Sequence, residues 1–137
     1  MRLRGAALAR RFPSVTIVLN HLGGKVTPET VPPSAMAEYK RNIEEIAGCE
    51  NVVCKISGIV VTANENWKPQ DLAPNMLFCM ETFGEDRAYF AGDWPVCRLR
   101  ATFRQWVDAL KWIVRDRPVA FQKKLFHDNA TRFYRLD

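Results

Sequence analysis

Three short apolar segments recur along the 137-residue chain, each followed by a polar residue close to a glycine. They are rich in β-branched or aromatic side chains and span residues 15–19, 51–56 and 87–91. Such runs are typical of buried parallel strands. The polar residues that follow them, His21, Ser57 and Asp93, are spaced 36 residues apart. We therefore expect one structural unit of constant length to repeat three times.

Helical patterns separate the three segments. Apolar side chains recur at spacings of three and four residues, the period of an amphipathic helix, over residues 35–47, 72–83 and 102–114. Gly48 and Gly84 follow the first two of these ranges and are expected to end the helices. Two more helical segments are expected at the C-terminus, over residues 119–126 and 130–136. Asp128 or Asn129 is expected to cap the last of them.

The alternation of helix and strand is typical of repeated βα units around a parallel sheet. A unit of this length is about one eighth of a TIM barrel. The sequence therefore predicts an α/β fold, a partial TIM (β/α)8 barrel of about three βα units, with residues 1–137 forming one part of that domain. We expect sequential parallel strands with helices on one face. On this interpretation the chain begins inside the helix that precedes the sixth strand, and three units cannot close a barrel.

Composition and charge argue against several classes of protein. The net charge is +5, but the basic residues are interspersed with acidic and aromatic ones and no nucleic-acid-binding motif accompanies them. No run approaches the roughly 20 apolar residues of a membrane span. The four cysteines form no C-x-x-C pair, which favours reduced thiols in a cytoplasmic protein. The Arg-rich segment 1–12 is interpreted as a helix before the first strand, with a targeting presequence as the alternative.

His21 and Asp93 follow the first and third predicted strands, at the strand ends where α/β barrels carry their functional residues. A neutral imidazole and a carboxylate are suitable ligands for a divalent metal, and either group can also move a proton. Both residues have ordinary structural uses as well, because a histidine beside a glycine turn or an aspartate before Trp-Pro can simply stabilise the turn. The residue types alone leave these alternatives open.

Five short motifs occur in order along the chain: Asn20–Gly24, Cys54–Gly58, Phe83–Arg87, Phe90–Val96 and Phe126–Tyr134. In this order and at these separations they resemble the C-terminal part of the amidohydrolase-related (amidohydrolase 2) family. The likeness is greatest to its sugar-lactonase-like branch of TIM-barrel metal-dependent hydrolases. The resemblance spans nearly the whole chain and implies the same barrel fold.

The resemblance implies catalytic and metal-binding roles for His21 and Asp93. The family's histidine at the end of the sixth strand lies beside the metal and polarises or helps to deprotonate the reacting group. The aspartate after the eighth strand binds the metal or activates water as a general base. Lys55 and Ser57 match a motif on the seventh strand and are expected to bind substrate, or else to line the barrel interior. Trp94 is expected to line the substrate pocket, with packing beneath its turn as the alternative.

The resemblance implies capping and packing for Asn129 and Tyr134, and the chain also departs from the family pattern. Ala91-Gly92 stands where members commonly have Gly-Ser before the aspartate. The family's His-x-His pair on the first strand and its histidine on the fifth strand have no counterpart in this sequence, in which His127 is the other histidine. A divalent metal, zinc or manganese, is thus expected in the complete enzyme, and weak or no metal binding is expected for this chain by itself.

The resemblance implies a metal-dependent hydrolase that acts on a small molecule, a lactone or related cyclic ester, through activated water. The alternatives are non-oxidative decarboxylation by the same fold and a non-catalytic remnant or binding module. The strands at 15–19 and 87–91 would each lack a neighbour, and the inner sheet face would expose Val, Ile and Phe side chains. We therefore expect self-association, or a partner that supplies the missing strands. Nucleic acid and membrane are not expected as partners.

Overall fold

The computed structural model describes residues 4–24 and 26–136. Three parallel strands form one sheet in the order β1-β2-β3: β1 (Ile17–Leu19), β2 (Val52–Ile56) and β3 (Ala88–Phe90). In the register of the sheet, Val18 is the partner of Val53, and Lys55 is the partner of Tyr89. The α/β fold with sequential parallel strands that the sequence predicts is confirmed.

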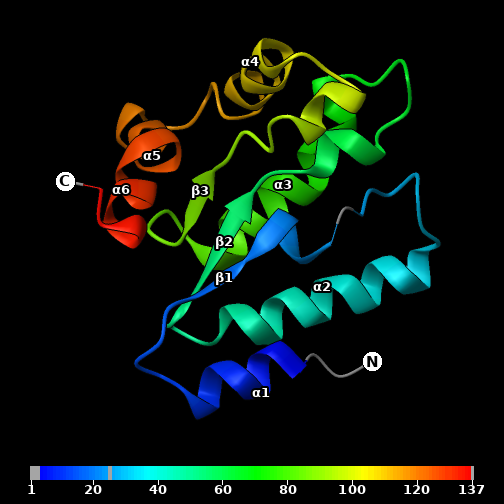
Figure 1. The fold of residues 1–137 in the computed structure, drawn as a ribbon. Helices are drawn as coiled ribbons and strands as arrows, with labels where there is room; N and C mark the ends of the chain where they lie inside the picture. The colour runs from blue at the N-terminus through cyan, green and yellow to red at the C-terminus, as the bar shows by residue number, and fades with distance from the viewer. Residues whose placement is uncertain (1–3, 25, 137) are drawn as a thin grey trace.

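Helices alternate with these strands (Figure 1). Helix α1 (Arg4–Arg11) precedes β1, α2 (Pro33–Ala47) connects β1 to β2, and α3 (Pro69–Phe83) connects β2 to β3. After β3 follow α4 (Phe103–Ile113), α5 (Val119–Lys123) and α6 (Asn129–Tyr134). Short 3-10 turns follow the strands at Asn20–Gly23, Ile59–Thr62 and Val96–Leu99, and a π-helical segment, Lys124–Asp128, joins α5 to α6. Within the described chain no helix has the length and apolar character to cross a membrane.

The helices begin where the local chemistry favours a first turn. Pro33 and Pro69 are the first residues of α2 and α3, a position that tolerates the missing N–H and uses the fixed φ of proline. Helix α4 begins behind Thr102, whose hydroxyl accepts the Gln105 N–H at 3.1 Å while the Gln105 side chain accepts the Thr102 N–H at 2.8 Å. This capping box satisfies two N–H groups that the helix itself leaves unpaired. The prolines extend α2 and α3 by two or three residues beyond the predicted starts.

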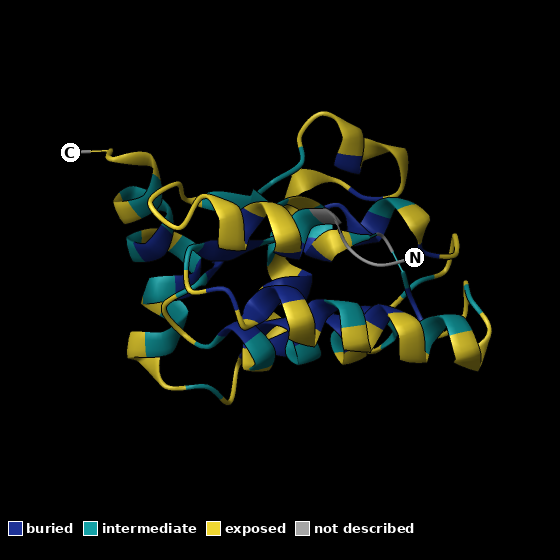
Figure 2. Ribbon diagram, turned by 90° about the horizontal axis from the view of Figure 1, so that it is seen from below, coloured by how far each residue is buried: buried dark blue, intermediate teal, exposed yellow. Residues whose placement is uncertain are grey.

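The hydrophobic core lies between the sheet and helices α2, α3 and α4. Cys54 and Ile56 of β2 belong to the same buried cluster as Ile43 of α2, Met76 of α3 and Trp106 of α4. Figure 2 shows buried positions concentrated in the middle of the molecule and exposed positions on the outer sides of the helices. Because burial of one large aliphatic side chain contributes about 1.5–3 kcal/mol, this cluster supplies the main force that holds the helices on the sheet.

The C-terminal helical segment lies along β3 (Figure 1) and contacts both faces of that strand. Phe126 packs against Phe90 on the face covered by the other helices, with ring centroids 5.5 Å apart. Tyr134 packs against Tyr89 with centroids 5.7 Å apart, and Tyr89 points to the opposite face because side chains alternate along a strand. The expectation of helices on one face alone is therefore wrong for α6, since aromatic rings on both sides of β3 attract it.

Asn129 does not cap a separate helix as expected. Asp128 has helical backbone angles, φ −62° and ψ −39°, so the helical run continues from α5 into α6 and the N–H groups there find acceptors in the preceding turn. The Asn129 side chain is 2% exposed and donates instead to the carbonyls of Glu85 at 2.7 Å and Ala88 at 2.8 Å. It thereby ties α6 to the beginning of β3.

The sheet face opposite α2 and α3 is less exposed than the sequence suggested. Val53 and Tyr89 on this face are each 1% exposed. The ring of Tyr89 contacts those of Phe133 and Tyr134, and its hydroxyl lies 2.8 Å from the Tyr134 hydroxyl. The expected exposure of apolar side chains is wrong at these positions, and at Tyr89 the reason is that the rings of α6 cover it.

Candidate active site

His21, Ser57 and Asp93 come together where the three strands end. The Nδ1 atom of His21 lies 2.8 Å from the Ser57 hydroxyl, and its Nε2 atom lies 3.8 Å from Oδ1 of Asp93. The 36-residue separation of His21 and Ser57 is thus the length of one βα unit, which returns the chain to the same edge of the sheet. The expectation that His21 and Asp93 share this edge is confirmed.

Both His21 and Asp93 hold a backbone conformation that is uncommon for residues with a side chain. The φ angle is 51° at His21 and 50° at Asp93. Left-handed angles of this kind cost on the order of 1–3 kcal/mol when they are not compensated, and they concentrate at functional sites. Each of the two residues lies in the turn that follows its strand, and the left-handed angles accompany the approach of the imidazole to the carboxylate.

Ser57 and Gly58 form the surface against which the imidazole lies. Ser57 is fully buried. Gly58 has a φ of +73°, and a Cβ atom built there would lie 2.4 Å from Nδ1 of His21. Glycine is therefore required at this position for two reasons, the backbone conformation and the close approach of the ring. The contact between Gly58 and the His21 ring was not predictable from the sequence, because it depends on the fold.

Asp93 combines burial with an unsatisfied oxygen. Its side chain is 12% exposed, against 34% for His21. Within the described residues its Oδ2 atom is buried and has no hydrogen-bond partner. A buried polar atom without a partner is costly, so this oxygen is available to accept a proton or a hydrogen bond or to bind a cation. Burial, assisted by the nearby Asp93 carboxylate, raises the pKa of the Cys97 thiol.

The other two predicted substrate-binding residues, Trp94 and Lys55, do not contact His21 as Ser57 does. Trp94 is 66% exposed beside Asp93, so its indole does not pack beneath the turn. The Lys55 ammonium lies 5.8 Å from the centre of the Tyr134 ring, on the sheet face covered by α6. Burial opposes ionisation of Tyr134, yet the Tyr89 hydroxyl and Lys55 hold the pKa of Tyr134 below its usual value. The structure therefore brings Ser57 to His21, while Lys55 faces the C-terminal helix.

His21 and Asp93 are chemically suited to a divalent cation, because neutral imidazole and carboxylate oxygen are common ligands of such ions. The unpartnered Oδ2 of Asp93 provides one available donor. Residues 4–24 and 26–136 contain no group of three or more His, Cys, Asp and Glu side chains placed to hold a metal ion.

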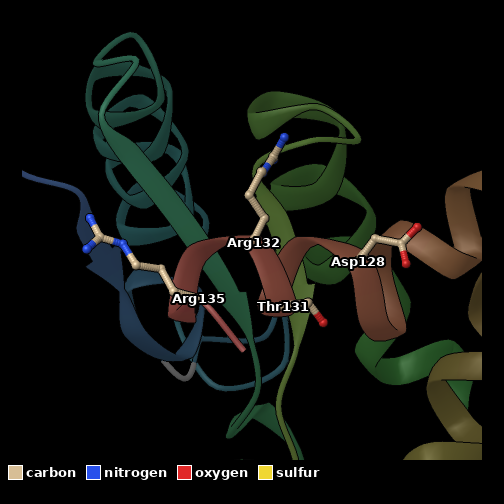
Figure 3. Close-up of a pocket in the computed structure, with 4 residues that line it drawn as sticks. All are labelled: Asp128, Thr131, Arg132 and Arg135. Atoms are coloured by element: carbon tan, nitrogen blue, oxygen red, sulfur yellow. The ribbon is translucent and has the colours of Figure 1, made fainter. Parts of the chain in front are cut away.

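A surface hollow of about 460 Å³ lies elsewhere, beside the C-terminal helix, and is lined by Asp128, Thr131, Arg132 and Arg135. Figure 3 shows these side chains pointing in different directions from the helix. The Arg132 guanidinium already donates to the Asp86 carbonyl. Because binding sites need polar groups that converge on a ligand, this hollow is a poor candidate, and the strand-end cluster of His21, Ser57 and Asp93 is the candidate active site.

The family model described as amidohydrolase matches residues 1–136 of this chain, nearly its full length. The chain belongs to the amidohydrolase family. It is 38% identical to the uncharacterized protein y4mH of Sinorhizobium fredii over 94% of this chain and 42% of that protein. It is 32% identical to an L-fucono-1,5-lactonase of Burkholderia ambifaria over 96% of this chain and 45% of the lactonase. This amidohydrolase chain thus spans less than half the length of these curated relatives.

Solved structures confirm the barrel fold. A crystal structure of an amidohydrolase from Burkholderia multivorans with bound Zn is similar with a TM-score of 0.84 and 26% identity, over 95% of this chain and 47% of that chain. Amidohydrolase 2 from Bifidobacterium longum subsp. infantis, at 22% identity, is similar in fold with a TM-score of 0.63, over 99% of this chain and 47% of that chain. The chain therefore corresponds to about half the length of these amidohydrolase TIM-barrel chains, and the partial barrel that the sequence predicts is confirmed.

Proposed function

We propose that this chain supplies the His21–Asp93 side of the active site in an amidohydrolase barrel that hydrolyses a lactone or related cyclic ester. The observation that carries the proposal is the buried Oδ2 of Asp93, which lacks a partner within the described residues while Oδ1 faces the imidazole of His21. A carboxylate held in this way is suited to act as a general base. The similarity to L-fucono-1,5-lactonases supports a sugar lactone as the substrate.

In the proposed reaction the Asp93 carboxylate accepts a proton from water while the water oxygen attacks the lactone carbonyl carbon. The ring C–O bond then breaks, and the proton that Asp93 took from water passes to the departing alkoxide, which restores the carboxylate. The Nε2–H of His21, whose nitrogen lies 3.8 Å from Oδ1 of Asp93 in the structure, donates a hydrogen bond to the oxygen that becomes negatively charged. One lactone and one water thereby give one hydroxy acid.

A divalent cation, zinc or manganese, is part of this proposal for the complete barrel. When bound, such an ion supplies positive charge that polarises the carbonyl and stabilises negative charge on its oxygen. Asp93 is the described residue that would contribute to holding it, through the Oδ2 atom that lacks a partner within the described residues, because Nδ1 of His21 contacts Ser57 and its Nε2 faces Asp93. The zinc in the amidohydrolase structure from Burkholderia multivorans supports a metal in the family.

The surroundings of the site complete the proposal. We propose that Trp94, exposed beside Asp93, lines the substrate pocket and that residues 1–137 form one part of a single barrel domain. Lys55 is a second candidate for substrate contact, provided that its ammonium leaves the Tyr134 ring. The four free, buried cysteines favour a reducing compartment, and we propose the cytoplasm. The strands that complete the barrel would come from the same polypeptide, from a partner or from further copies of the chain.

Activity can be tested by joining this chain to the part of the Burkholderia ambifaria lactonase that it does not match; the match covers 45% of the lactonase. Lactone opening is followed by acid release with a pH indicator. The fusion is expected to hydrolyse L-fucono-1,5-lactone, and Asp93→Asn is expected to lower kcat by about 100-fold or more. Asp108→Asn, at an aspartate whose side chain is 63% exposed, is the matched control and should have no effect.

Three outcomes would contradict the proposal. A folded fusion in which Asp93→Asn retains full activity would remove the assigned base. Release of carbon dioxide from a carboxylic acid substrate, without lactone opening, would identify the decarboxylase alternative. A folded fusion inert toward both substrate classes would favour a non-catalytic remnant.

A further inference from the structure

We propose that Ser57 is a positioning residue, which selects the Nε2–H tautomer of His21 and aims that N–H at Asp93. The inference rests on the proposed function, because it assigns the ring nitrogen of His21 that presents its N–H to the reacting lactone. It changes the expected role of Ser57 from substrate contact to control of the neighbouring imidazole. The 2.8 Å contact between the Ser57 hydroxyl and Nδ1 of His21 is its starting point.

The burial of Ser57 decides between positioning and direct chemistry. Serine, histidine and aspartate in a row also occur in enzymes whose serine attacks the substrate. A nucleophilic hydroxyl must reach the substrate, whereas Ser57 is 0% exposed and His21, with 34% of its side chain exposed, is the accessible member of the pair. The Ser57 hydroxyl therefore acts on the imidazole and not on a substrate carbonyl.

The direction of the hydrogen bond follows from the groups at the two ring nitrogens. If Nδ1 carried the proton and donated it to Ser57, the lone pair of Nε2 would face the Asp93 carboxylate across 3.8 Å. That arrangement places two electron-rich atoms opposite each other. If the Ser57 hydroxyl donates to Nδ1, the proton is on Nε2 and faces Oδ1 of Asp93, which is attractive. The second arrangement also gives the buried hydroxyl proton of Ser57 an acceptor.

Gly58 restricts the imidazole from the same side. A Cβ atom at this position would lie 2.4 Å from Nδ1 and 2.8 Å from Cγ of His21, so the ring already lies against the Gly58 backbone. The ring cannot move further toward β2, and the Ser57 hydroxyl holds its Nδ1 edge. The orientation of Nε2 toward Asp93 is thus fixed by a hydrogen bond and by a steric limit.

Nitrogen-15 NMR of the chain labelled at histidine tests the tautomer directly. The chain has two histidines, and His21→Ala assigns their signals. At pH 9 His21 is expected to carry its proton on Nε2 in more than about 95% of the molecules, with Nδ1 as the acceptor. Ser57→Ala should reduce this fraction toward that of free histidine, and Ser57→Thr, which keeps the hydroxyl, should retain it.

Two controls separate this effect from general damage. Thr82→Ala removes a hydroxyl that bonds the Phe78 carbonyl within α3 at 2.7 Å, and it should leave the His21 signals unchanged. His127, whose Nδ1 lies 2.9 Å from the Asp128 carboxylate, serves as an internal reference in every spectrum. Circular dichroism reports whether Ser57→Ala folds. If it does not fold, the unmodified chain still decides, because a proton on Nδ1 of His21 would overturn the inference.

The activity of the fusion described above distinguishes the two proposals. Ser57→Ala should lower kcat about tenfold with KM nearly unchanged, and Ser57→Thr should restore most of the loss. If the unmodified fusion folds, carries the His21 proton on Nε2 and has no lactonase activity, the proposed reaction is wrong. The tautomer assignment then still holds. Lactone turnover with His21 at Nδ1–H, or a Ser57→Ala variant with unaltered tautomer and kcat, would overturn the role of Ser57 alone.

Discussion

Replacement of Gly58 by alanine should disturb the candidate site, because the added side chain would meet the imidazole of His21. The added Cβ atom would lie 2.4 Å from Nδ1 of His21. Ordinary van der Waals contact begins near 3.4 Å, so the imidazole must move by roughly 1 Å. Such a shift breaks the 2.8 Å contact with Ser57 and turns Nε2 away from Asp93.

The expected loss of stability has three contributions. Alanine in the left-handed conformation, at a φ of +73°, costs about 1 kcal/mol relative to glycine. Loss of the hydrogen bond between Ser57 and His21 costs about 1 kcal/mol. Displacement of a part-buried ring adds about 1 kcal/mol. We therefore expect Gly58→Ala to lower the free energy of unfolding by about 3 kcal/mol.

Gly58→Ala in a His21→Ala background is the matched control, because it keeps the backbone cost and removes the ring that the Cβ atom would meet. There the substitution should cost about 1 kcal/mol, from the backbone alone. In urea unfolding the cost of Gly58→Ala should be about 2 kcal/mol larger with His21 present, or roughly 1 M in midpoint. Equal costs of Gly58→Ala in the two backgrounds would refute the steric argument.

Three further outcomes are expected. Asn129→Ala should lower the free energy of unfolding by about 2–3 kcal/mol in urea melts, because the carbonyls of Glu85 and Ala88 lose their donor; a neutral effect would show that water replaces the amide. Calorimetry with zinc or manganese should show weak or no binding to the chain alone, whereas a tight one-to-one site abolished by combining His21→Ala with Asp93→Asn would reveal a more complete metal site. Sedimentation at micromolar concentration should show self-association, because β1 has a strand neighbour on one side only among the described residues; a cooperatively unfolding monomer would contradict it.

The order and type of the elements were predictable from the sequence, because hydrophobic period and glycine stops are local features. The first strand is shorter than predicted, starting at Ile17 rather than residue 15. The Asn51 side chain accounts for this difference, since it donates to the carbonyls of Ala9, Phe12 and Val15 and holds the approach to β1 in a turn. A long-range side-chain contact of this kind leaves no periodic pattern in the sequence.

The C-terminal region shows a second limit of local patterns. The sequence indicates two helical segments and a polar residue between them, which reads as a cap. In the structure Asn129 lies inside a continuous helical run and donates to backbone oxygens near β3. An asparagine at this position indicates a hydrogen bond to the backbone. The packing of α6 on β3 determines which carbonyls accept it, those of Glu85 and Ala88.

The candidate site was predictable in its members but not in its geometry. The repeat places His21, Ser57 and Asp93 at successive strand ends, and parallel strands bring those ends together. The left-handed angles at His21 and Asp93 were not predictable from the residue types, because most residues with a side chain avoid such angles. The role of Ser57 was likewise hidden, since a strand-end serine contacts substrate or protein depending on its burial.

The features of the site that suit the proposed chemistry lower the stability of the fold. Two left-handed residues, each costing on the order of 1–3 kcal/mol, and a buried carboxylate oxygen without a partner in the described chain are all unfavourable for folding. Backbone hydrogen bonds hold both strained turns, from the Gly24 N–H to the His21 carbonyl at 2.9 Å and from the Cys97 N–H to the Asp93 carbonyl at 2.8 Å. These bonds fix the turns without satisfying Oδ2 of Asp93. The local contacts therefore stabilise the positions of His21 and Asp93 and leave Oδ2 of Asp93 without a partner in the described chain, as the proposed reaction requires.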